Sequence, residues 1–244
     1  MNQKMLFDNS KIFKVPLKSS NQLVAGNTLA LVSIFLFAAG FPAAEVLLDV
    51  WHPITLMFVR LLLAVSTLVV VWAFIEGLSS VLKAPWLKGI KIGLLGFGLG
   101  TNLLLFAQWF TDPITVALLA TLIPISATIL EVWDGRRKLN SRFILGLSAS
   151  IIGGFIAVSE NISIDLGWGV LMALGSGFCF MWASDKSVTR LSELSSIARS
   201  SVTFTGAAVF TTISFAVFFT LGLIEIPNRL SSGQFLSLII YSVI

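Results

Sequence analysis

Two ionisable residues stand at similar depths in neighbouring apolar segments near the N-terminus. Glu45 precedes and Arg60 follows a short turn at residues 51–53, and the apolar runs on both sides are long enough to cross a membrane as helices. At 1.5 Å per residue, both side chains would lie roughly 6–10 Å below the outer membrane surface, where two antiparallel helices could bring them together. Acids and bases at that depth usually face a cavity or a pathway.

Three interpretations of this pair are open. Arg60 could extend its long stem to the lipid headgroups, the two side chains could form a structural ion pair, or they could bind a substrate or a coupling proton. The intramembrane position favours the third. In that case Arg60 would hold a carboxylate or phosphate, and Glu45 would pair with Arg60 in the empty state or carry the proton.

Three further polar residues lie in apolar segments. Asn102 and Gln108 are in the third predicted helix, and Thr121 is in the fourth. A buried amide or hydroxyl needs a hydrogen-bond partner, so these side chains either join helices to one another or line a cavity.

Two prolines fall inside predicted helices. Pro42 lies three residues before Glu45, and Pro124 lies in the middle of the fourth helix. Proline has no backbone N–H and therefore leaves a carbonyl without its helical partner. We expect a helix break at each proline, with backbone carbonyls open to the same cavity.

The rest of the composition excludes several classes of site. The chain has one cysteine, Cys179, and one histidine, His52, so it has no intrachain disulfide and no ligand set for a thiolate metal cluster. We expect no metal, no cofactor and no enzymatic activity, because an intramembrane enzyme acting on lipid would need a nucleophile or metal set that is missing. The net charge of +4 is spread over four loops, so we expect no nucleic acid partner.

The elements that position these residues follow from the apolar pattern. Hydrophobic residues make up 56% of the 244 residues and charged ones 11%, against about 25% charged in soluble domains. This predicts an all-α, polytopic membrane protein of about eight helices, with close packing at the glycines of the third helix (Gly93–Gly100) and the fifth (Gly146, Gly154). The predicted helices cover about 28–49, 53–75, 89–110, 113–133, 142–159, 167–185 and 198–223, and an eighth starts near 234.

The basic residues predict the orientation. Most of the 16 basic residues lie in the N-terminal tail or in the loops after the second, fourth and sixth helices. Basic residues accumulate in cytoplasmic loops, so the tail and these loops are expected on the cytoplasmic side. We therefore expect a cytoplasmic tail at residues 1–27 and an inner (plasma) membrane location. The eighth apolar run reaches Ile244 after about half a membrane thickness, so we also expect a truncated chain.

The order of these features resembles that of the EamA-type members of the drug/metabolite transporter superfamily. The resemblance rests on Phe41-Pro42 in the first helix, on the spacing of Pro53 and Arg60, and on the third helix at Gly100–Ala107. It continues with the central Pro124 and with a basic loop, Trp133–Asn140, before the glycine-rich helix.

The resemblance implies ten helices in two inverted five-helix repeats, the first at 28–159 and an incomplete second at 167–244. It also implies a secondary transporter that moves small polar metabolites or amino acids by alternating access, and export rather than import. The site would have Glu45 and Arg60 on one wall and Asn102, Gln108 and Thr121 on another. The partners would be the small-molecule substrate, the lipid bilayer and a coupling proton, with a homodimer left open. The alternative is a non-transporting membrane fragment or subunit.

Overall fold

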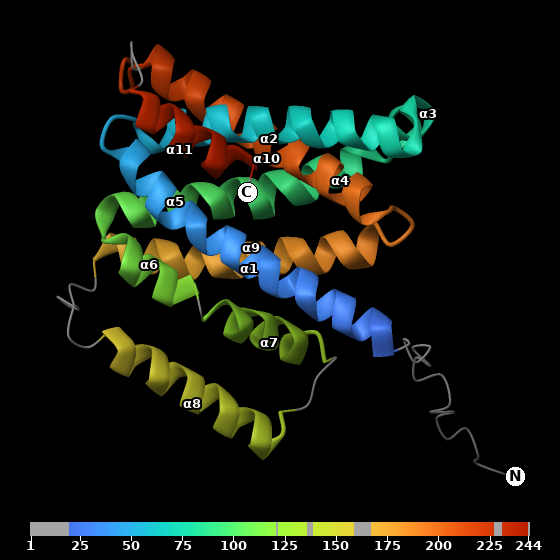
Figure 1. Cartoon of the computed structure of the whole chain (residues 1–244), viewed down its shortest axis with the longest axis vertical. Coiled ribbons are helices and arrows are strands. Elements are labelled where there is room, and N and C mark those ends of the chain that lie inside the picture. The colour runs from blue at the N-terminus through green and yellow to red at the C-terminus, as the bar shows by residue number, and fades with distance from the viewer. Residues whose placement is uncertain (1–19, 121, 136–138, 159–166, 227–230, 244) are drawn as a thin grey trace, which may run out of the picture. The chain divides into compact units, whose positions relative to one another are not determined.

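The computed structural model (Figure 1) describes residues 20–120, 122–135, 139–158, 167–226 and 231–243. The chain divides into two compact units, Met1–Ala38 and Ala39–Ile244. Every element within the described ranges is a helix. The elements are α1 (Ser20–Leu48), α2 (Pro53–Glu76), α3 (Leu78–Lys83), α4 (Trp86–Ile92), the π-helical segment η2 (Gly93–Gly98), α5 (Leu99–Phe110), α6 (Pro113–Ala120), α7 (Ile123–Trp133), α8 (Ser141–Val158), α9 (Trp168–Arg190), α10 (Ser196–Thr220) and α11 (Ser232–Val243).

Five stretches of the described chain are long and apolar enough to cross a membrane. They are Val24–Leu48, Pro53–Glu76, Trp86–Phe110, Pro113–Trp133 and Ser196–Thr220. The third joins α4, η2 and α5 into 25 residues, roughly 37 Å at 1.5 Å per residue, which exceeds a hydrocarbon core of about 30 Å. Large apolar side chains such as Phe74, 85% exposed, lie on the surface, which suits lipid and not water. The expected all-α polytopic membrane fold is confirmed, whereas the two repeats stay a prediction.

The helix ends differ from the prediction where polar residues follow or precede an apolar run. α1 begins at Ser20 and not near residue 28, and α9 continues to Arg190 and not to residue 185. The apolar pattern marks only the part of a helix inside the hydrocarbon, whereas the backbone hydrogen bonds can continue into water with polar side chains.

The two prolines behave differently from each other. α1 continues through Pro42, so the break expected there is not seen: one missing N–H removes a single bond from a helix that its neighbouring turns maintain. In the fourth span, α6 ends at Ala120 and α7 begins at Ile123, with Pro124 in the first turn of α7. An N–H in that turn has no intrahelical acceptor, so proline costs little there.

The third span packs closely against its neighbours through glycines. A methyl group at Gly89 would lie 2.5 Å from Val202 on α10, and one at Gly100 would lie 3.2 Å from Cys179 on α9. α5 accordingly lies beside α9, and α2 beside α10 (Figure 1). Gly146 of α8 has nothing within 4 Å, so the packing expected at that glycine is not present.

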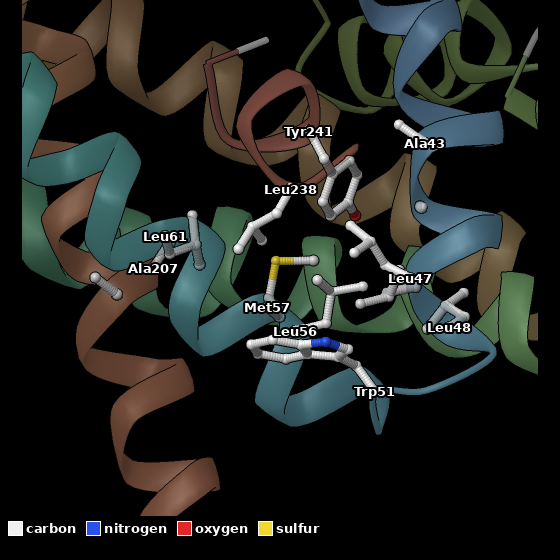
Figure 2. Close-up of a cluster of buried hydrophobic side chains, with 13 residues drawn as sticks. Ala43, Leu47, Leu48, Trp51, Leu56, Met57, Leu61, Ala207, Leu238 and Tyr241 are labelled. Atoms are coloured by element: carbon white, nitrogen blue, oxygen red, sulfur yellow. The ribbon is translucent and has the colours of Figure 1, made fainter. Parts of the chain in front are cut away.

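An apolar cluster joins the end of α1 to α2 and α11 (Figure 2). Leu47 of α1, Met57 of α2 and Tyr241 of α11 belong to this cluster, together with Trp51 in the turn between α1 and α2. All four side chains are buried. The cluster therefore holds the hairpin of α1 and α2 that carries both ionisable residues of the predicted site.

Candidate functional site

A cavity of about 390 Å³ lies where α1 and α5 end and α6 begins, and it opens to the surface. Its lining residues are Glu45, Leu48, Asp49, Gln108, Trp109, Thr111, Asp112 and Pro113. Three of these residues are acidic and none is basic, so the cavity attracts positive charge. We call it the acidic cavity. In the part of the chain that the structure describes, no three His, Cys, Asp or Glu side chains are placed to hold a metal ion.

Gln108 is the most deeply buried polar side chain of the acidic cavity, at 8% exposed. Its amide nitrogen Nε2 donates a hydrogen bond to the backbone carbonyl of Phe41 at 2.7 Å. A carbonyl accepts only from the NH₂ group, so this bond determines which way the amide is turned. The oxygen Oε1 has no hydrogen-bond partner among the described residues and is available as an acceptor in the cavity.

Asp112 gives the acidic cavity a negative charge at neutral pH. Its carboxylate caps α6 by accepting a hydrogen bond from the Thr115 backbone N–H at 2.8 Å. Partial burial raises the pKa of the Asp112 carboxyl, but hydrogen bonds from the Thr115 side chain and from the backbone of Thr115, Asp112 and Ile114 together outweigh it. The net pKa lies below its ordinary value. The carboxylate is therefore ionised under physiological conditions.

Glu45 and Arg60 do not meet. Glu45 is exposed and lines the acidic cavity, whereas its neighbours on α1 belong to the apolar cluster: Ala43, Ala44, Leu47 and Leu48. A helix turns by about 100° per residue, so Glu45 points away from the face that contacts α2. Similar depth on two antiparallel helices was therefore insufficient to predict contact.

Arg60 contacts Tyr241 of α11. Its Nε donates a hydrogen bond to the Tyr241 carbonyl at 2.8 Å, and the guanidinium carbon lies 3.9 Å from the centre of the Tyr241 ring. This cation–π contact and the hydrogen bond join α2 to α11. Arg60 is half-buried, and it is not among the residues that line the acidic cavity.

The two remaining candidates lie elsewhere. Asn102 is buried and donates a hydrogen bond to the Gly98 carbonyl of its own span at 2.7 Å, so its amide neither joins two helices nor lines the acidic cavity. Thr121 lies outside the described residues. Of the five predicted binding residues, the structure brings together Glu45 and Gln108.

Several lining residues were not predicted as part of a site. Asp49, Trp109, Thr111 and Asp112 come from the ends of α1 and α5 and from the turn before α6. Asp49 ends the first predicted helix and Asp112 follows the third, so both are expected on the same side of the membrane, and this is the signal that could have brought them together.

His52 lies in the turn next to this region and in an aromatic environment. Its Nδ1 accepts a hydrogen bond from the Ile54 N–H at 3.3 Å, which caps α2. Its ring lies about 6 Å from the rings of Phe106, Trp109 and Phe218. Burial lowers the pKa of the His52 imidazole, so the ring is neutral at pH 7.

A fold of several membrane-spanning helices with a polar cavity between helix ends defines a polytopic helical membrane protein. Residues 24–159 match the EamA-like transporter family, which is more than half of the 244 residues. The chain belongs to this family, part of the drug/metabolite transporter superfamily, whose members are membrane transporters and not enzymes. A small-molecule substrate and membrane lipid are therefore its partners. No curated protein and no solved structure matches the chain.

Proposed function

We propose that the protein is a secondary transporter of the inner (plasma) membrane, with its N-terminus in the cytoplasm, that exports amino acids or other small polar metabolites by alternating access. The observation that carries this proposal is the acidic cavity, in which Glu45 and the buried amide of Gln108 lie together. A volume of about 390 Å³ is at the small end of the range of ligand cavities and suits a small metabolite.

The chemistry of the acidic cavity favours a substrate with an ammonium group. The carboxylates of Glu45, Asp49 and Asp112 would attract the positive charge, and Oε1 of Gln108 would accept a hydrogen bond from it. Glu45 could also carry a coupling proton, as the sequence analysis proposed.

A role for Arg60 in substrate binding would require a second arrangement of the helices. In the present one its guanidinium is held by Tyr241, and a substrate carboxylate would have to displace that contact. Such an exchange of partners would accompany the change from one helix arrangement to another in alternating access.

The test is uptake by proteoliposomes that contain the purified protein, with radiolabelled lysine, alanine and glutamate as the cationic, zwitterionic and anionic probes. We expect lysine and alanine to enter above the level of protein-free liposomes, and glutamate less so. Glu45→Gln should reduce lysine uptake about tenfold, because a hydrogen bond to a charged group is worth roughly 1.5–3 kcal/mol.

Glu193→Gln is the matched control, because Glu193 is exposed and does not line the acidic cavity. Equal losses in both variants, or a preference for glutamate, would contradict the proposed site. If none of the three probes enters above the protein-free level, the non-transporting alternative is favoured.

A further inference from the structure

A second cavity, of about 520 Å³, lies at the opposite end of the third span. Its lining residues are Lys88 and Lys91, Ile92 and Leu95, and Trp182 and Arg190 of α9. Those from the third span occupy positions i, i+3, i+4 and i+7, which form one face of a helix. We call it the basic cavity.

Among the described residues, the three cations of the basic cavity have no counter-ion. Lys88, Lys91 and Arg190 are exposed, and none of them makes an ion pair within the ranges that the structure describes. Asp185 and Asp134 lie beside a different base, since Lys186 Nζ is 3.1 Å from Asp185 and 3.7 Å from Asp134. The cavity therefore carries three positive charges and no acid in its lining.

The wall between these cations is apolar. Ile92 is buried, Trp182 is half-buried and Leu95 is 58% exposed on a membrane-spanning helix, so that the wall continues onto a surface that faces lipid. Lys88 and Lys91 stand in the first two turns of the span, and Arg190 is the last residue of α9. These positions correspond to the level of the lipid headgroups.

We propose that the basic cavity binds an anionic phospholipid from the adjacent leaflet, with its phosphate between Lys88, Lys91 and Arg190 and one acyl chain along Ile92, Leu95 and Trp182. Basic pockets between membrane helices suit anionic headgroups, and the apolar wall distinguishes a lipid from a free phosphate, which would leave it uncovered. The bound lipid would bridge the start of α4 and the end of α9.

The experiment compares lipid retention by the purified full chain in native mass spectrometry, with phosphatidylglycerol and phosphatidylcholine of identical acyl chains as probes. We expect the protein to retain phosphatidylglycerol preferentially. The double variant Lys91→Gln/Arg190→Gln should lower this retention about tenfold, since each basic residue near the surface adds to the attraction for anionic lipid.

The matched control is Lys83→Gln/Arg142→Gln, which removes two exposed basic residues that do not line the basic cavity. Leu95→Gln tests the apolar wall separately, and because Leu95 is exposed, this variant should fold. It should weaken retention of phosphatidylglycerol while all three cations remain in place.

Three results would overturn the proposal. They are equal retention of the two lipids, an equal loss of phosphatidylglycerol in the control variant, and displacement of the lipid by glycerol 3-phosphate at equal concentration. The last would indicate a site for free phosphate compounds without an acyl chain. The elution of each variant in size-exclusion chromatography shows whether it is folded, and the comparison uses folded variants.

Discussion

The imidazole of His52 both caps a helix and contacts aromatic rings. It caps α2 with Nδ1, and its half-buried ring lies about 6 Å from three aromatic rings. Capping requires a nitrogen lone pair, and burial penalises the charged ring, so both favour the neutral form. Protonation would remove the cap and place a charge in an apolar environment.

We therefore predict that the folded protein loses stability on acidification through His52. Its folded pKa lies below the unfolded value of 6.5, so its contribution to stability is complete above pH 6.5 and is lost as the pH falls through the folded pKa. On acidification from pH 7 to pH 5, the thermal midpoint in detergent should fall less for His52→Asn than for the wild type. Asparagine retains a capping acceptor and does not titrate. If His52→Asn and the wild type showed the same pH dependence, His52 would not be its source. The chain has one histidine, so no other imidazole complicates this comparison.

The sequence predicted part of the candidate site for a physical reason. Glu45 and Gln108 stand out because a charge or an amide in an apolar run is costly unless it has a function or a partner. The partner of Arg60 could not be predicted, because Tyr241 is 181 residues away and contributes a backbone oxygen, which every residue has. The orientation of Glu45 could not be predicted either. α1 is apolar on several faces, so its sequence does not show which face packs against the rest of the protein.

At the scale of elements, the backbones of the third span and α10 approach closely at Gly206. A methyl group at Gly206 would lie 2.8 Å from both the Cα of Ile90 and the backbone nitrogen of Leu94. These are backbone atoms, so a rotamer change cannot relieve the overlap. The two helices would have to separate, and packing through small residues is what holds membrane helices together.

We predict opposite effects for two glycine-to-alanine substitutions. Gly206→Ala should lower the free energy of unfolding by roughly 1–3 kcal/mol, the typical cost of overpacking. Gly146→Ala meets nothing within 4 Å and should be neutral or stabilising by up to about 1 kcal/mol, because alanine favours a helix more than glycine does. Thermal midpoints from fluorescence-detected size-exclusion chromatography would measure both. A similar loss in the two variants would show that helix flexibility and not close packing governs these positions.

The helices themselves were predictable, and the details of their backbone were not. Apolar runs of the right length, separated by short turns, located every long helix to within a few residues at most ends. The π-helical turn at Gly93–Gly98 was not predicted, because the apolar pattern does not distinguish a π-turn from an α-turn. The glycines of this turn lie against α9 and α10. The continuity of α1 at Pro42 likewise depends on its neighbouring turns.

At the scale of the molecule, the two cavities at opposite ends of the third span differ in charge. The acidic cavity has three carboxylates, and the basic cavity has three cations. Basic residues beside membrane helices accumulate on the cytoplasmic side. The basic cavity would then face the cytoplasm and the acidic cavity the outside, as the loop charges predict.

Cysteine labelling would test this orientation. In a Cys179→Ala background, we predict that a membrane-impermeant maleimide labels Glu225→Cys in intact cells and labels Ser192→Cys only after permeabilisation. Both positions are exposed, and α10 separates them. The Cys179→Ala protein without an added cysteine is the blank, and the reverse labelling pattern would invert the topology.

The π-helical turn in the middle of the third span has a consequence for the position of the acidic cavity. A π-turn holds one more residue than an α-turn, so every side chain beyond Gly98 is rotated by about 100° relative to an uninterrupted helix. Gln108 lies beyond that point, and its amide reaches Phe41 in this rotated register. If the same residues formed an unbroken α-helix, the Gln108 amide would be aimed at a different neighbour, so an irregularity in the middle of the span determines the orientation of a polar group near its end.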